Sequence, residues 1–217
     1  MLFDGLLDAR IAVAESSIGS ATFVLMPEET VAMRGAVLSR QNEFAAGRHC
    51  ARVAMAELGR HGLAVAMGGD RAPIWPDGLV GSISHCGSWC AAAVARIADG
   101  FAAIGIDIEA AGPLEIDLAK EICTNGEREW LAAMPEAKRG LLLAAIFSAK
   151  EATYKCQYAL TGKLIDFQAL SIEFDLEDSR FQARFEIDVL PYKVGDTLPG
   201  AIRFGAEHIT TAVVVQR

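Results

Sequence analysis

Apolar and polar residues alternate along the segment Gly-Ile-Asp-Ile-Glu, residues 105–109, which is the pattern of a β-strand. We expect this strand to span residues 102–109. Because successive side chains on a strand point to opposite faces, Asp107 and Glu109 share one face. The pattern therefore predicts a strand that presents two carboxylates side by side.

Two longer segments have apolar residues at helical spacing. Residues 38–59 predict a helix with one apolar face, with Ser39 as its N-cap and glycines at its end. Residues 139–160, which contain Phe-Ser-Ala-Lys-Glu-Ala-Thr-Tyr-Lys, predict another. Glu151 and Lys155 are four residues apart on this second helix and are therefore neighbours on its surface.

The remaining pattern predicts a mixture of helices and short strands. A helix is expected at 118–134, interrupted or capped near 124–127, and hairpin turns are expected at 98–100 and 175–179. Further strands are expected at 80–85, 89–97, 169–174, 180–187, 201–204 and 208–215. Each half of the chain then holds a long helix and mostly antiparallel strands, so we predict an α+β fold rather than a regular βαβ series.

Composition narrows the class of protein. The 217 residues are 52% hydrophobic and 22% charged, as in a protein with a sizeable core. The amino terminus lacks the basic and apolar regions of a signal peptide, no apolar run is long enough to span a membrane, and we expect a cytoplasmic protein. Five cysteines without C-x-x-C spacing favour reduced thiols. A zinc site at His85, Cys86 and Cys90 would need a second pair of ligands at a suitable spacing, which the sequence lacks.

The charge distribution bears on the partner. A formal net charge of −8 argues against nucleic acid as a partner. Every basic residue before Lys120 is an arginine, whose planar fork suits bidentate contact with phosphate. A coding bias toward arginine explains the same observation equally well.

The charged positions on the strand and the helix suggest one chemistry. Three carboxylates, Asp107, Glu109 and Glu151, are a suitable donor set for a hard cation such as Mg²⁺ that also holds phosphate oxygens. Nearby lysines supply the complementary charge for that phosphate. A solvated strand face and a surface Glu151–Lys155 pair are the structural alternatives. The arrangement suggests a metal-assisted reaction on a phosphate or diphosphate.

Four segments in consistent order resemble the Sfp/EntD-type 4′-phosphopantetheinyl transferases. They are Asn-Glu-Phe-Ala-Ala-Gly-Arg-His-Cys-Ala-Arg (42–52), Pro-Ile-Trp-Pro-Asp-Gly-Leu-Val-Gly-Ser-Ile-Ser-His-Cys (73–86), Gly-Ile-Asp-Ile-Glu (105–109) and Phe-Ser-Ala-Lys-Glu-Ala-Thr-Tyr-Lys (147–155). The resemblance implies transfer of the phosphopantetheine arm of coenzyme A to a serine of an apo acyl, peptidyl or aryl carrier protein, with release of adenosine 3′,5′-bisphosphate.

The resemblance also implies an architecture and a setting. Two similar α+β halves, 1–105 and 106–217, would be related by a pseudo-two-fold axis and hold coenzyme A between them in a monomer. The cation would be Mg²⁺, with Mn²⁺ an alternative. The carrier would belong to siderophore, polyketide or nonribosomal-peptide synthesis, or to fatty-acid synthesis, and neither nucleic acid nor a membrane would be a partner.

The resemblance assigns roles to individual residues. Metal ligands would be Asp107, Glu109 and Glu151, and catalytic roles would fall to Glu151, Lys155 and Asp107, with Glu151 or a water beside it accepting the serine proton. Side chains matching coenzyme A-binding positions are Arg40, Arg48, Arg71, Ser84, His85, Asp107, Lys150 and Lys155. The arginines would hold the adenosine end, His85 the 3′-phosphate, and both lysines the diphosphate.

Other functions fit parts of the sequence. A Mg²⁺-dependent nuclease would need an acid-x-Lys order on one strand, but Glu109 is followed by two alanines. A nucleotide diphosphate hydrolase would need a Glu-rich helix, and residues 141–155 hold only Glu151. A non-catalytic coenzyme A- or carrier-binding protein of the same fold would be expected to lose at least one of the three acidic residues.

Overall fold

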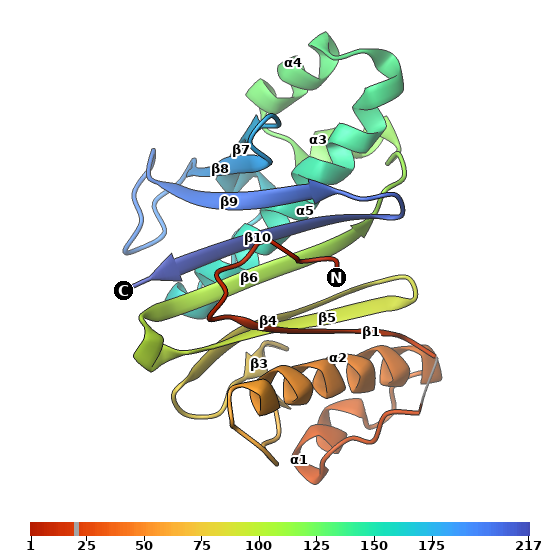
Figure 1. Cartoon of the computed structure of the whole chain (residues 1–217). Helices are drawn as coiled ribbons and strands as arrows, with labels where there is room; N and C mark the ends of the chain where they lie inside the picture. Colours follow the sequence, from red (N-terminus) through yellow and green to blue (C-terminus); the bar gives the residue numbers. More distant parts are fainter. Residues whose placement is uncertain (20–21) are drawn as a thin grey trace.

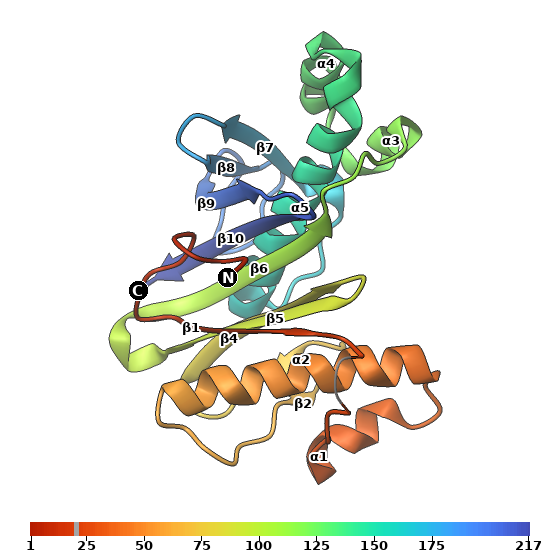
Figure 2. The same cartoon turned by 45° about the vertical axis from the view of Figure 1, so that its right-hand side comes forward.

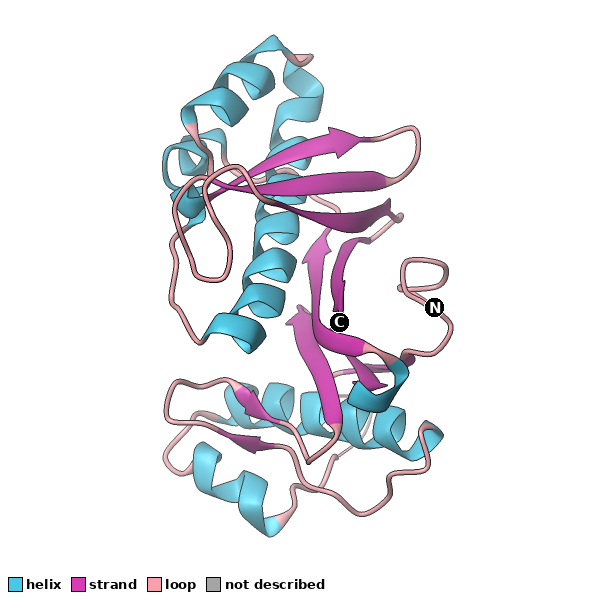
Figure 3. Cartoon of the chain, turned by 90° about the vertical axis from the view of Figure 1, so that its left-hand side faces the viewer, coloured by secondary structure: helices cyan, strands magenta, loops and turns pink. Residues whose placement is uncertain are grey.

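The computed structural model describes residues 1–19 and 22–217, which form two antiparallel sheets with one long helix against each (Figures 1 and 2). The smaller sheet has the strand order β1-β5-β4 and the larger one β6-β10-β9-β8-β7. Helix α2 packs on the smaller sheet and α5 on the larger, as the secondary-structure view shows (Figure 3). The predicted α+β fold is therefore confirmed.

The strands of the two main sheets and of a small hairpin have the following bounds. The smaller sheet consists of β1 (Ala12–Ser17), β4 (Leu79–Cys86) and β5 (Trp89–Arg96). The larger sheet consists of β6 (Phe101–Ala110), β7 (Leu170–Asp175), β8 (Arg180–Phe185), β9 (Thr197–Phe204) and β10 (His208–Gln216). The hairpin consists of β2 (Ala66–Met67) and β3 (Pro73–Ile74).

Over the described residues there are two long α-helices and three short ones. Their bounds are α1 (Pro27–Thr30), α2 (Leu38–Glu57), α3 (Ala119–Ile122), α4 (Asn125–Ala133) and α5 (Glu136–Thr161). Val37, not Ser39, caps α2, and it does so without a side-chain hydrogen bond. Thr124 and Glu127 form a reciprocal capping box that begins α4, which explains the interruption predicted near 124–127.

The two halves repeat one topology. In each, the first strand leads to the long helix, and the last strand returns to pair with the first: β1 with β5, and β6 with β10. The duplication is therefore architectural. The predicted boundary between residues 105 and 106 falls inside β6, whose pairing with β10 continues on both sides of it. The smaller sheet ends with β5 at Arg96, and the larger sheet begins with β6 at Phe101.

The turn before β6 also differs from its prediction. Residues Ile97–Asp99 form a 3-10 turn, and Gly100 has a φ of 91°, where glycine is favoured. However, β5 and β6 are not hairpin partners, since they belong to different sheets. The hairpin predicted across 175–179 is confirmed by the pairing of β7 with β8.

Serine hydroxyls join the two sheets where β4 lies beside β6. The N–H of Ile106 donates to Ser82 Oγ at 3.0 Å, and the N–H of Ile108 donates to Ser84 Oγ at 3.2 Å. Helix α5 also approaches β6 closely. A Cβ on Gly105 would lie 1.9 Å from the carbonyl oxygen of Ala152, so this contact requires glycine. These contacts fix β6 between the halves.

In the described part of the chain, none of the helices has both the length and the apolar character needed to cross a bilayer.

Candidate active site between the two halves

A cavity of about 520 Å³ opens between the halves. The first half contributes side chains from α2, from β4 and from the loop between β2 and β3, and the second half contributes one face of α5. Its basic and imidazole side chains are Arg40, Arg48, Arg71, His85 and Lys155. The structure thus gathers five residues predicted to bind coenzyme A, which lie between positions 40 and 155 of the sequence.

Lys155 is the cation nearest the predicted acidic residues. Its Nζ lies 2.6 Å from Asp107 Oδ1 and 3.2 Å from both Ser84 Oγ and the carbonyl oxygen of Ile106. About a quarter of the Lys155 side chain is exposed, whereas Asp107 is buried. The lysine therefore connects the cavity to the strand that carries the acidic residues.

Asp107 is held by hydroxyl groups on both of its oxygens. Ser84 Oγ donates to Oδ1 and Ser148 Oγ donates to Oδ2, each at 2.9 Å. Ser148 also lies 2.9 Å from the hydroxyl of Thr211 on β10. Ser84 is thus a support for Asp107 rather than a lining residue of the cavity, and it faces away from His85, which is exposed.

Glu109 and Glu151 complete the acidic group. Burial, followed by the negative charge of Asp107, raises the pKa of Glu109 to about 7. Burial also raises the pKa of Glu151, which Lys155 partly offsets. Burial therefore makes ionisation of Glu109 and of Glu151 unfavourable. A cation bound between them would stabilise the charged forms of both.

The donor chemistry of these carboxylates fits a hard cation. Across residues 1–19 and 22–217, however, no three His, Cys, Asp or Glu side chains already lie in an arrangement that could hold a metal ion. The side chains would have to turn to converge on one.

Arg48 forms part of the cavity wall. Its Nε donates to the carbonyl oxygen of Val65 at 2.7 Å, and its guanidinium lies over the ring of Phe44, 4.0 Å from the centroid. Burial lowers the pKa of Arg48 to about 10, so the group stays charged at neutral pH. Among the described residues, its two terminal nitrogens have no hydrogen-bond partner in the protein.

Arg40 and His85 lie together at the cavity. Arg40 Nη1 is 3.1 Å from His85 Nε2 and 3.3 Å from Glu43 Oε2. The His85 side chain is 37% exposed, and the loss of water around its covered part is the main cause that lowers its pKa; Glu43 opposes this, while Arg40 and Lys155 add to it. The imidazole is therefore predominantly neutral at pH 7.

Arg71 lies on the loop between β2 and β3, with a φ of 71° that non-glycine residues seldom adopt. The neighbouring Asp70 accepts a hydrogen bond of 2.6 Å from the hydroxyl of Tyr158 on α5. This bond ties the loop of the first half to the helix of the second.

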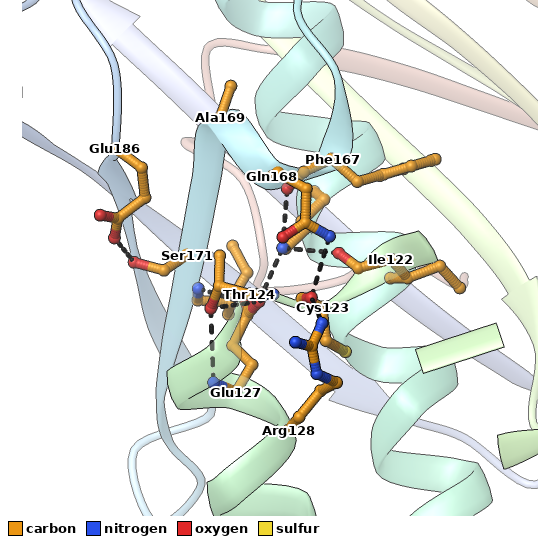
Figure 4. A network of polar contacts seen from close by, with 12 residues as sticks. Ile122, Cys123, Thr124, Glu127, Arg128, Phe167, Gln168, Ala169, Ser171 and Glu186 are labelled. Carbon is orange, nitrogen blue, oxygen red and sulfur yellow. Dashed lines mark hydrogen bonds and ion pairs between the residues drawn. The ribbon is translucent and has the colours of Figure 1, made fainter. Parts of the chain in front are cut away.

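The prediction that Lys150 faces a diphosphate is corrected by the structure. Its Nζ is buried and donates to Glu127 Oε2 at 2.7 Å and to the carbonyl oxygens of Ile122 and Phe167 at 2.8 Å. Figure 4 shows these three partners within one network of polar contacts. Lys155 is five positions after Lys150, which places the two side chains about 140° apart around a helix. Lys150 therefore faces the α3–α4 segment, while Lys155 faces Asp107.

Sequence reasoning missed several residues at the site. Ser148 lies seven residues before Lys155, two helical turns away on the same face, and this spacing could have identified it. Tyr154 and Tyr158 also line the cavity, and they lie four residues apart on the same helix. Trp75 also lines the cavity.

A two-half α+β fold that encloses basic side chains beside a group of carboxylates defines a protein that handles a phosphate-bearing ligand. Comparison with known proteins identifies the family. The 4′-phosphopantetheinyl transferase N-terminal domain matches residues 27–95, and the 4′-phosphopantetheinyl transferase superfamily matches residues 103–211. The gap between the two matches contains the turn that leads from β5 to β6.

Individual relatives agree. The chain is 38% identical to 4′-phosphopantetheinyl transferase Svp of Streptomyces mobaraensis, over 88% of this chain and 79% of that one. It is 41% identical to 4′-phosphopantetheinyl transferase Npt of Nocardia iowensis, over 70% and 67%. It is 38% identical to enterobactin synthase component D of Escherichia coli K12, over 61% and 62%. The chain belongs to the 4′-phosphopantetheinyl transferase superfamily and is an enzyme of that type.

Proposed function

We propose that this enzyme transfers the 4′-phosphopantetheine arm of coenzyme A to a serine of an apo carrier protein and releases adenosine 3′,5′-bisphosphate. One observation carries the proposal: the cavity between the halves combines a group of arginines with Lys155, which is bonded to Asp107. Coenzyme A has the same distribution of charge, because its 3′-phosphate and its diphosphate lie at different places on the molecule.

The basic side chains divide between the two phosphate positions. Arg40, Arg48, Arg71 and His85 line the part of the cavity formed by the first half, and hold the adenosine end and the 3′-phosphate. Lys155 holds the diphosphate, at the position where Asp107 now neutralises it. Trp75 and the ring of Phe44 give the same cavity apolar walls for the adenine.

Asp107, Glu109 and Glu151 would hold a divalent cation, Mg²⁺ or Mn²⁺. When bound, such an ion neutralises the charge on the diphosphate and orients it for in-line attack. This chain's own contribution is to keep Asp107 in place through the hydroxyls of Ser84 and Ser148. Those two bonds hold the Asp107 carboxylate in its present orientation, so Glu109 and Glu151 are the side chains that would turn toward a cation.

Glu151 is the base that accepts the proton of the carrier serine. Its pKa is raised by burial, which makes the carboxylate a stronger proton acceptor than a solvated one. It lies one helical turn from Lys155, so the proton leaves the serine close to the position where Lys155 stabilises the negative charge that develops.

The setting of the reaction follows the same proposal. The carrier is an acyl, peptidyl or aryl carrier domain of siderophore, polyketide or nonribosomal-peptide synthesis, and the enzyme acts as a cytoplasmic monomer. The enterobactin synthase component among the relatives supports the siderophore setting.

Intact-mass spectrometry of an apo carrier protein incubated with the enzyme, coenzyme A and Mg²⁺ tests the proposal. We expect the carrier to gain one phosphopantetheine arm, and the gain to be lost with chelator and in Asp107→Asn and Glu151→Gln. Glu173→Gln, at an exposed glutamate on β7, is the matched control and should retain activity. No mass gain with carriers of several pathways would refute the proposal.

A further inference from the structure

Glu29 on α1 is a fully buried carboxylate outside the cavity. Its Oε2 accepts from Arg52 Nη1 at 2.5 Å and from the N–H of Met26 at 2.9 Å. Its Oε1 accepts from the N–H of Val65 at 3.1 Å. Both oxygens are therefore committed to groups from α1, α2 and the segment that precedes β2.

Val65 connects Glu29 to the cavity. Its N–H is held by Glu29, while its carbonyl oxygen accepts from Arg48 Nε at 2.7 Å. Because Nε is bonded in this way, the two terminal nitrogens of Arg48 are left for a ligand in the cavity that Arg48 lines. The position of the Val65 backbone therefore sets the direction of the Arg48 fork.

Val65 also begins the hairpin that carries Arg71. It is followed directly by β2, which pairs with β3 across the loop of residues 68–72. A shift of Val65 would move the base of this hairpin, and Arg71 with it. Glu29 thus acts on two of the cavity's arginines through a single backbone residue.

Charge balance supports the same role. Burial and the positive charges of Arg40 and Arg52 lower the pKa of Arg48. The carboxylate of Glu29 raises it and so favours the charged guanidinium. Arg52 itself is paired with Glu29 and donates to the carbonyl oxygen of Val24 at 2.7 Å. Glu29 therefore permits two guanidinium groups to lie side by side on α2.

We propose that Glu29 is a positioning residue for the 3′-phosphate of coenzyme A, acting through Val65 on Arg48 and Arg71. This inference rests on the proposed function, in which Lys155 and the carboxylates take the diphosphate. The arginines at the first-half end of the cavity are then left with the other phosphate of the ligand, which is the 3′-phosphate.

Glu29→Gln tests this role with little change in volume. An amide has one acceptor oxygen where the carboxylate has two. Arg52 and the Met26 N–H share one position, so the amide oxygen stays with them and the NH₂ group faces the N–H of Val65. Two donors then oppose each other, and Val65 is displaced.

The measurement is the dissociation constant, by titration calorimetry, of coenzyme A and of 3′-dephospho-coenzyme A. In Glu29→Gln we expect coenzyme A to bind about tenfold more weakly and the dephospho analogue to change by less than about threefold. Glu28→Gln, at the exposed neighbouring glutamate, should change neither. If the variant weakens both ligands equally, or neither, the positioning role is refuted.

Two further variants separate positioning from folding. Arg52→Met removes the ion pair but leaves the bond between Glu29 and Val65, so we expect a lower Tm with an unchanged ratio of the two dissociation constants. If Arg52→Met weakens coenzyme A relative to the dephospho analogue as much as Glu29→Gln does, the proposal is overturned. If Glu29→Gln does not fold, Glu29→Asp keeps the charge with a shorter reach and should weaken the binding of coenzyme A more than that of the dephospho analogue.

The calorimetry also separates this inference from the proposed function. Binding is measured without a carrier and without transfer. A wild-type enzyme that fails to bind coenzyme A overturns both, whereas normal wild-type binding with an unchanged ratio in Glu29→Gln overturns only the role of Glu29.

Discussion

Replacing Lys150 by methionine tests whether this lysine supports the fold or binds a phosphate. The change keeps the length of the side chain but removes three hydrogen bonds, to Glu127 and to the carbonyl oxygens of Ile122 and Phe167. It leaves the Glu127 carboxylate buried without a cation. Lys150 and Glu127 are 1% and 4% exposed, so water cannot replace the lost partner.

The magnitude follows from that burial. Removing one partner of a buried ion pair costs about 3–5 kcal/mol. Glu127 keeps hydrogen bonds from the N–H groups of Thr124 and Ile172, which places the expected cost toward the lower end of that range. For a chain of this length, each kcal/mol lowers Tm by about 2–4 °C, so we expect a fall of about 6–12 °C.

Urea denaturation and calorimetric titration with coenzyme A give the two readouts. The structure predicts a large loss of stability and nearly unchanged coenzyme A affinity for the folded protein. Lys120→Met, at an exposed lysine, is the matched control and should change stability by less than about 0.5 kcal/mol. The structural role is refuted if Lys150→Met is as stable as this control but binds coenzyme A at least about tenfold more weakly.

Three further predictions concern β6 and its neighbours. Gly105→Ala should reduce the free energy of unfolding, measured in urea, by about 3 kcal/mol or more, because its Cβ would meet the carbonyl of Ala152. Gly112→Ala, at a position with open space, is the control and should be neutral. Equal stability of the two variants would refute the close contact. In metal-free protein, the pKa of Glu109, raised to about 7, predicts that stability falls as pH rises from about 4.5 to 7, since the unfolded state loses its proton first; solvent screening keeps this well below about 3 kcal/mol. Glu109→Gln should flatten that dependence in urea titrations at each pH, and an unchanged slope would contradict the assignment. Ser84→Ala should cost about 1–3 kcal/mol in urea, because a buried N–H of β6 loses its acceptor; a cost near zero would show that the hydroxyl does not join the halves.

Local periodicity was sufficient for the elements that carry the chemistry. The alternation that predicted Asp107 and Glu109 on one face corresponds to β6, and the helical spacing of Glu151 and Lys155 corresponds to α5. Both predictions depend only on residues within one segment. The cap of α2 and the turn at Gly100 were less accessible, since ends and turns depend on what the adjoining segments pack against.

Periodicity could not predict which distant residues the side chains of these segments contact. Lys150 and Lys155 occur in one motif, yet one binds Glu127 and the other Asp107. The helix period separates their directions, but only packing shows what lies in each direction.

The sequence by itself determined the α+β class, the acidic face of β6, the charged face of α5 and, through its four motifs, the family. Only the tertiary structure decided that Ser84 supports Asp107, that Lys150 is a structural cation and that Glu29 is connected to Arg48 through Val65. The physical reason is that side-chain direction within a segment follows from the backbone period. A contact between distant segments follows from how their faces pack, and no local pattern encodes that.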